Sequence, residues 1–199
     1  VDQYLGINRL SIATASVTQE EDNTTYELLH FAKLCAGFNP NVIPLLFLEE
    51  QNYTVLTESG KKLLSIRDSF VSNKFRRTLH GYALSQREKM DKKITGKLGT
   101  KRKELIEKFG YDVKAAAVTI RLLDMGISLN VTGKVCLDGS SGICKNVRLG
   151  LYSVNIINNL IEKRINEFQE SENLLSFGDP DYATINKTCR EILCKELGL

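Results

Sequence analysis

The sequence predicts an α+β protein, with a small mixed α/β portion over residues 1–56 and a mainly helical portion over 57–199 that carries a short β insertion. Three observations lead to this prediction. RLSIATASV (9–17) alternates loosely between apolar and polar residues, as strands do. From residue 72, apolar residues recur at three- and four-residue steps, which is typical of amphipathic helices. ISLNVTGKVCL (127–137) alternates again and favours a strand or hairpin.

Local signals predict the elements of the first part. Residues 24–27 (TTYE) have the spacing of a capping box and open a helix that Gly37 ends. Pro40 places a turn at NPN, because proline cannot continue a helix and biases the preceding residue toward extended backbone. NYTVLT (52–57) is strand-like, and Ser59 caps the helix that follows.

Helices dominate the second part. Asp112 is a suitable N-cap for the helix that begins there, and Gly126 stands where a left-handed residue would end it. GSSG (139–142) is expected to be a loop. The helices expected here span residues 72–93, 100–109, 112–125, 153–173 and 181–197.

The helix at 112–125 is apolar on nearly every side, yet it carries two cations. Lys114 and Arg121 are seven residues apart, so they differ by only about 20° in azimuth and about 10.5 Å in height, and they share one stripe with Val118 and Met125. A helix that is apolar all round is normally buried, so both cations need a partner. Two interpretations remain open: structural ion pairs with neighbouring helices, or an anion site that faces a cleft.

Composition narrows the class of protein. The chain is 42% hydrophobic and 26% charged, which is ordinary for a globular protein, and no apolar run reaches the roughly 18 residues that span a bilayer. Five cysteines without a CxxC pair, together with only two histidines, argue against a disulfide framework or a zinc site. We therefore expect reduced thiols, a cytoplasmic location and no membrane partner.

Positive charge is concentrated in one segment. Residues 74–114 hold 13 Lys and Arg against 5 Asp and Glu, whereas the rest of the chain holds 14 against 19. Such a basic segment favours a polyanionic partner such as nucleic acid, through the release of counterions. A solvated helix face explains the same composition equally well.

Four stretches in order resemble the predicted nucleotidyltransferases of the polymerase-beta-like superfamily that are associated with RNA ligases. They are LLHFAKLCAGFNPNVIPLLF (28–47), LHGYALSQREKM (79–90), YDVKAAAVTIRLLDMG (111–126) and NVRLG (146–150). The resemblance implies that residues 1–56 are part of a nucleotidyltransferase-like α/β core. It also implies transfer of a nucleoside monophosphate from an NTP to an acceptor, assisted by Mg²⁺. The nucleotide-binding and phosphate-binding residues that it implies are Lys114, Arg121, Arg148, Tyr82 and Gln86.

The chain departs from the family at its catalytic signature. The Gly-Ser pair and the Asp-x-Asp motif are expected upstream of the first residue, and Gly139-Ser140 and Asp179-x-Asp181 are better explained as turns. Asp22 is the candidate third carboxylate, with Glu27 as the less favoured choice, although Asp22 also suits a plain loop and Glu27 a capping box. Val118 stands where the family has histidine.

The sequence as given is therefore expected to be incompetent as an enzyme by itself. Three explanations are open: a trimmed chain, a split protein whose second chain supplies the catalytic segment, or a degenerate relative. The alternative function is a noncatalytic nucleic-acid-binding or assembly module that uses the basic segment 74–114.

Overall fold

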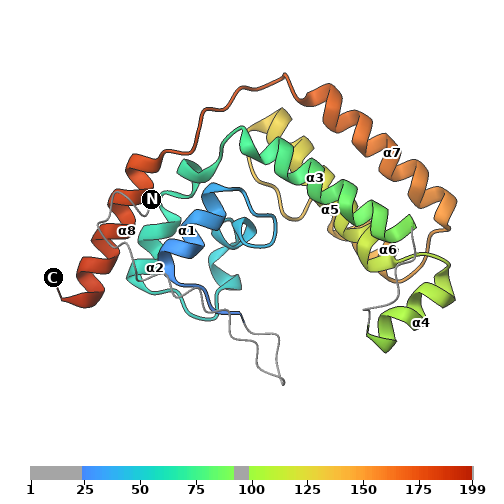
Figure 1. Ribbon diagram of the computed structural model, residues 1–199, viewed down its shortest axis with the longest axis horizontal. Helices are drawn as coiled ribbons and strands as arrows, with labels where there is room; N and C mark the ends of the chain where they lie inside the picture. The colour runs from blue at the N-terminus through green and yellow to red at the C-terminus, as the bar shows by residue number, and fades with distance from the viewer. Residues whose placement is uncertain (1–23, 92–98, 199) are drawn as a thin grey trace. The chain divides into compact units, whose positions relative to one another are not determined.

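The computed structural model describes residues 24–91 and 99–198, and within these ranges the protein is all-α (Figure 1). The prediction of an α+β fold is wrong for these residues, which contain no strand. The expected strand at 9–17 lies outside them. The α-helices are α1 (Leu28–Ala36), α2 (Glu58–Leu64), α3 (Lys74–Asp91), α4 (Thr100–Phe109), α5 (Val113–Thr132), α6 (Ser141–Arg148), α7 (Val154–Ser171) and α8 (Tyr182–Leu197). The 3-10 helices are η1 (Ile43–Leu46), η2 (Glu50–Asn52) and η3 (Arg67–Phe70).

The expected β insertion at 127–137 is instead the second half of α5. This helix passes through Gly126 without a break and ends at Gly133, whose φ of 72° is the left-handed cap that had been assigned to Gly126. Burial explains the difference, because Gly126, Leu129 and Asn130 are buried at the three- and four-residue spacing of a helix face. Tertiary packing overrides the strand preference of the β-branched residues in this stretch.

Smaller corrections apply at two helix starts. Glu27, rather than Thr24, is the N-cap of α1: its carboxylate accepts hydrogen bonds from the amides of Leu29 at 2.9 Å and His30 at 2.8 Å. Thr57 caps α2 in place of Ser59. The strand expected at 52–57 is an irregular link between η2 and α2.

The chain forms two compact units. One comprises residues 1–74 with 177–199, of which the described part contains α1, α2, η3 and α8; the other comprises residues 75–176. In the first unit, α8 packs against α1, α2 and η3 and buries Ile185 and Cys189. These two units differ from the portions expected at 1–56 and 57–199. The assignment of 1–56 to a nucleotidyltransferase-like core stays a prediction.

In the second unit, α5 is the central helix and packs mainly on α6 and α7. Among the described residues it is the one helix that is long and apolar enough to cross a bilayer, but most of it is buried inside this unit, as in the core helix of a soluble protein. Its N-cap is Asp112, as predicted, whose Oδ1 accepts from the amides of Lys114 and Ala115. Arg102 of α4 pairs with Asp112 Oδ2 at 2.6 Å and ties α4 to the start of α5.

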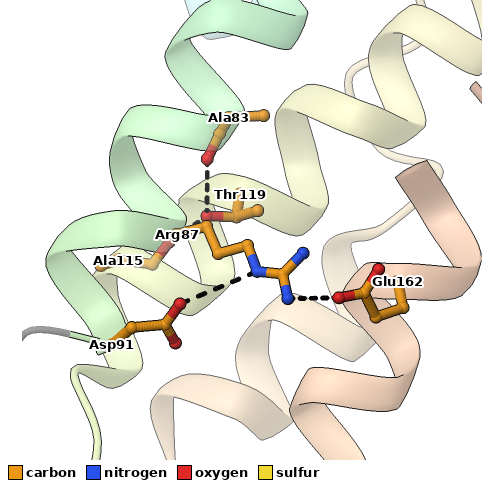
Figure 2. A network of polar contacts seen from close by, with 6 residues as sticks. All are labelled: Ala83, Arg87, Asp91, Ala115, Thr119 and Glu162. Carbon is orange, nitrogen blue, oxygen red and sulfur yellow. Dashed lines mark hydrogen bonds and ion pairs between the residues drawn. The ribbon is translucent and has the colours of Figure 1, made fainter.

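Polar contacts join α3 to α5 in the buried core and α3 to α7 at the surface (Figure 2). The hydroxyl of Thr119 lies 3.0 Å from the carbonyl oxygen of Ala115 and 3.4 Å from that of Ala83, so α5 is linked to α3 at a fully buried position. Arg87 of α3 pairs with Glu162 of α7 and, at 3.8 Å, with Asp91. These contacts fix the three helices that carry most of the candidate site residues.

Candidate anion-binding site

Arg121 is a half-buried cation on α5 that forms no ion pair with any residue in the described ranges. Its Nε is buried and has no hydrogen-bond partner. No carboxylate of the described residues forms an ion pair with its guanidinium. Burial, and to a smaller extent the positive charge of Arg148, lowers the pKa of Arg121. An arginine stays charged nonetheless, so this position holds a cation whose surroundings favour an anion.

Arg148 supplies a second positive charge to the same place. It is the last residue of α6, which packs directly on α5, and it is exposed to solvent. Its charge is felt by both Arg121 and the thiol of Cys144. Two guanidinium groups near each other repel unless an anion lies between or beside them. This pair is the part of the predicted phosphate site that the structure brings together.

Cys144 lies beside both arginines, and sequence reasoning missed it. Its Sγ lies 3.3 Å from the carbonyl oxygen of Ala117, to which the thiol donates. Burial raises the pKa of Cys144 and outweighs the opposing effect of Arg121 and Arg148. The thiol is therefore protonated at neutral pH and gives Arg121 no negative charge. Nothing in the sequence around Cys144 indicated that it lies near the arginines, since a lone cysteine usually packs as a small apolar residue.

Lys114 differs from Arg121 in its surroundings. It is exposed, and no carboxylate of the described residues pairs with it. The shared stripe thus runs from a solvated lysine at the start of α5 to Met125, which is 2% exposed. The expectation that both cations are buried and need partners is wrong for Lys114. The ion pairs of α5 instead use its own carboxylates, Asp112 and Asp124, with arginines of α4 and α7.

The other predicted site residues do not join the arginine pair through any contact in the described ranges. Tyr82 and Gln86 lie one turn apart on α3, the first exposed and the second half-buried. Asp22 lies outside the described residues. Glu27 is used as the N-cap of α1.

The described residues do not fit a magnesium site. They contain no group of three or more Asp, Glu, His or Cys side chains that could hold a metal ion. Arg148 adds a second positive charge near Arg121, and Asp124, one turn away, is paired with Arg164, so this place disfavours Mg²⁺. No catalytic step through a metal follows from these residues.

The basic segment 74–114 is partly used inside the fold. Arg76 donates to Asn130 and to the carbonyl oxygen of Leu175, and Arg87 and Arg102 form the ion pairs described above. Outside these contacts, cations of α3 and α4 face solvent; among them are Arg77, Lys89, Lys101 and Lys108. The segment is therefore a mixture of structural arginines and solvated lysines.

Comparison with known proteins adds no relative to this picture. No family model matches the chain, and neither a curated protein nor a solved structure matches it. The fold and the site thus define a class only: an all-α protein, over the described residues, with an uncompensated arginine pair where α5 meets α6.

Proposed function

We propose that the protein binds the phosphates of a nucleoside triphosphate at Arg121 and Arg148, as a member of the nucleotidyltransferase class that its sequence resembles. The observation that carries this proposal is the buried Nε of Arg121 beside a second arginine: within residues 24–91 and 99–198 this Nε has no hydrogen-bond partner and neither arginine has a carboxylate partner. A phosphate would relieve the repulsion between the two guanidiniums and satisfy the buried N–H. Arginine suits this role because its planar fork can hold two phosphate oxygens at once.

In this proposal Lys114 contacts the end of the triphosphate that lies farthest from Arg121. It lies two turns before Arg121 on the same stripe of α5, about 10.5 Å along the helix axis. That separation suits the far end of an extended triphosphate rather than the phosphate that contacts Arg121. Transfer of a nucleoside monophosphate to an acceptor with Mg²⁺, in the cytoplasm, belongs to the same proposal. It requires carboxylates beyond those of the described residues, whether from this chain or a second one.

Binding rather than turnover is the appropriate test. We expect isothermal titration of ATP in EDTA to give a measurable affinity that falls at least about tenfold, or about 1.4 kcal/mol, in Arg121→Met. Arg148→Met should weaken binding too, and Lys114→Met less so. Arg77→Met is the matched control, because it removes an exposed arginine of α3 in the same unit. Equal losses in all four variants would reduce the site to general electrostatic attraction, and no binding would reject it.

Nucleic-acid binding by the basic segment is the second candidate. The solvated cations of α4 favour it, in particular Lys101 and Lys108. The logarithm of the affinity should then fall linearly with the logarithm of salt concentration, by about 0.7 to 0.9 for each phosphate neutralised. Lys101→Gln with Lys108→Gln should reduce that slope while Arg121→Met leaves it unchanged. The reverse pattern would assign the polyanion to the arginine pair.

A further inference from the structure

A concave site lies further along α5 than Arg121, beginning one turn on at Asp124, and it uses none of the residues of the proposed function. It is an open pocket of about 380 Å³, a size that suits a small molecule. Three segments enclose it: the second half of α5, the link before α6, and α7. The lining residues are Asp124, Ile127, Ser128, Val131, Thr132, Cys136, Gly139, Ser140, Arg164 and Glu167.

Charge in this pocket is opposite to that at Arg121. Arg164 Nε lies 2.7 Å from Asp124 Oδ1, and its Nη1 lies 2.6 Å from Glu167 Oε2, so one cation stands between two carboxylates. The contact with Asp124 is a close charge pair rather than a well-aligned hydrogen bond, because the Nε–H finds no acceptor in line. Glu167 is also paired, at 3.7 Å, with the exposed Lys163, whereas Asp124 has only its share of Arg164 and no other cation partner among the described residues.

Asp124 has a carboxylate oxygen that can still accept a hydrogen bond from a ligand. Its side chain is mostly buried, and its Oδ2 has no hydrogen-bond partner among the described residues. Burial raises the pKa of Asp124 and outweighs the attraction of Arg164. A carboxylate in such surroundings is stabilised by a further cation.

The rest of the lining is apolar on one side and hydroxylated on the other. Ile127 and Val131 are one turn apart on α5 and present aliphatic surface to the pocket. The hydroxyl of Thr132 already donates to the carbonyl oxygen of Ser128, and that of Ser128 to the carbonyl oxygen of Lys134. Both hydroxyls are thus committed as donors, and Thr132 Oγ1 also accepts from the amide of Lys134 at 3.2 Å, so Ser128 keeps more acceptor capacity for a ligand than Thr132 does. An ammonium group, which donates and never accepts, matches them.

We propose that this pocket binds a small primary alkylamine, whose ammonium contacts Asp124 and whose methylene chain lies along Ile127 and Val131. The ammonium gives Asp124 a counter-charge of its own, because Arg164 is shared with Glu167, and its N–H donors meet a lining that offers oxygen acceptors. The aliphatic part covers the exposed flank of Val131, which is 52% exposed. This ligand class differs from a nucleotide in charge, so the two sites can be tested separately.

The probe is n-butylammonium, with n-butanol as a neutral molecule of the same chain length. We expect saturable chemical-shift changes on addition of butylammonium that centre on residues 124–140 and 164–167, and none of comparable size with butanol. Val131→Lys should abolish them, because it adds a competing ammonium at an exposed position without disturbing the core. Leu84→Lys is the matched control, since Leu84 is also an exposed apolar residue of a helix, at 42%, and does not line the pocket.

Asp124→Asn should remove butylammonium binding while Arg164 keeps its contact with Glu167. If that variant fails to fold, the exposed Cys136 offers a second measurement. Butylammonium should slow alkylation of this thiol in the wild-type protein and leave it unchanged in Val131→Lys. Unsaturable shifts, equal effects of butanol, or equal loss in Leu84→Lys would each overturn the proposal. ATP binding at Arg121 is judged by its own variants, Arg121→Met and Arg148→Met, because Asp124 lies only one turn from Arg121.

Discussion

Gly126 of α5 lies directly against the ring of Phe168 on α7: a Cβ at position 126 would stand 2.1 Å from Phe168 Cε2. The two helices therefore approach each other at a point where only hydrogen fits. Phe168 is fully buried, and its ring also stacks on His80 of α3 at 5.5 Å between centroids. The glycine is needed for packing and not for a left-handed turn.

Gly126→Ala should therefore destabilise the protein in spite of the better helix propensity of alanine. We expect a loss of about 1–3 kcal/mol in urea unfolding, because Phe168 cannot move far in a filled core. Gly81→Ala is the matched control: Gly81 also lies inside a helix, and an added Cβ there meets nothing within 4 Å. It should gain about 0.5–1 kcal/mol. A neutral Gly126→Ala would show that the helices separate without cost.

The same glycine explains the main failure of sequence reasoning. A glycine that follows an apolar run has the same local pattern whether it ends a helix or admits a neighbouring ring, and only the position of Phe168 decides. A helix that ends at Gly126 leaves the alternation of 127–137 to favour a strand, and this is the source of the wrong β insertion. Caps were predictable in part: Asp112 caps α5 as expected, through bonds to its own next residues, whereas α1 and α2 are capped by Glu27 and Thr57.

The candidate site, like the fold, was predictable only in its local features. Seven-residue spacing placed Lys114 and Arg121 on one stripe, but spacing gives no information about depth, and the two differ in burial. Cys144 and Arg148 of α6 follow Arg121 by 23 or more residues, so only the packing of α6 on α5 brings them close to it. The pocket beside Asp124 is likewise a tertiary feature and has no local pattern in the sequence.

The burial of α5 leads to a prediction about shortening its core side chains. Ile120 and Leu122 are 0% and 1% exposed. Replacing either with alanine should cost about 2–5 kcal/mol in urea unfolding, through lost transfer free energy and a residual cavity. Val131→Ala, at an exposed position of the same helix, should change the free energy of unfolding by less than about 0.5 kcal/mol. Similar small losses at both buried sites would refute the burial of α5.

Asp112 combines two roles that substitution can separate. It caps α5 through Oδ1 and pairs with Arg102 through Oδ2. Asp112→Ala should lose both and cost about 1–2 kcal/mol or more, whereas Asp112→Asn keeps a capping oxygen and should cost less. Arg102→Met tests the ion pair alone, and its effect should shrink in high salt. If Asp112→Asn proved as damaging as Asp112→Ala, the charge rather than the cap would dominate.

The absence of a partner for Arg121 among the described residues has a consequence for stability. Arg121→Met should leave the thermal midpoint of the ligand-free protein unchanged or raise it, because it removes a desolvated cation that repels Arg148. Arg164→Met is the comparator, since Arg164 stands between two carboxylates, and its loss should lower the midpoint. A drop in both variants would point to an ion pair for Arg121 outside the described residues.

Two neighbouring buried thiols make the protein sensitive to alkali. Burial, with a smaller contribution from Cys189, raises the pKa of Cys35 from 9.0 to about 12, and burial, with a smaller contribution from Glu27, raises that of Cys189 to about 11. Between the unfolded and folded values the folded protein holds more protons, so its stability falls as pH rises. The contribution is complete below pH 9.0 and is lost as pH rises through the folded values.

Between its unfolded and folded pKa values, each thiol should lower the free energy of unfolding by up to about 1.4 kcal/mol for each unit rise in pH. We expect Cys35→Ala to be less stable than the wild-type protein at neutral pH but to lose less stability between about pH 9 and about pH 10.5, as measured by urea unfolding at each pH. Cys136→Ser is the control, because Cys136 is exposed and its removal should not change the slope. Alkylation by iodoacetamide near pH 8, followed by mass spectrometry, should modify Cys136 and spare Cys35 and Cys189 until the protein unfolds. An unchanged slope in Cys35→Ala, or rapid modification of either buried thiol, would contradict their burial between α1 and α8.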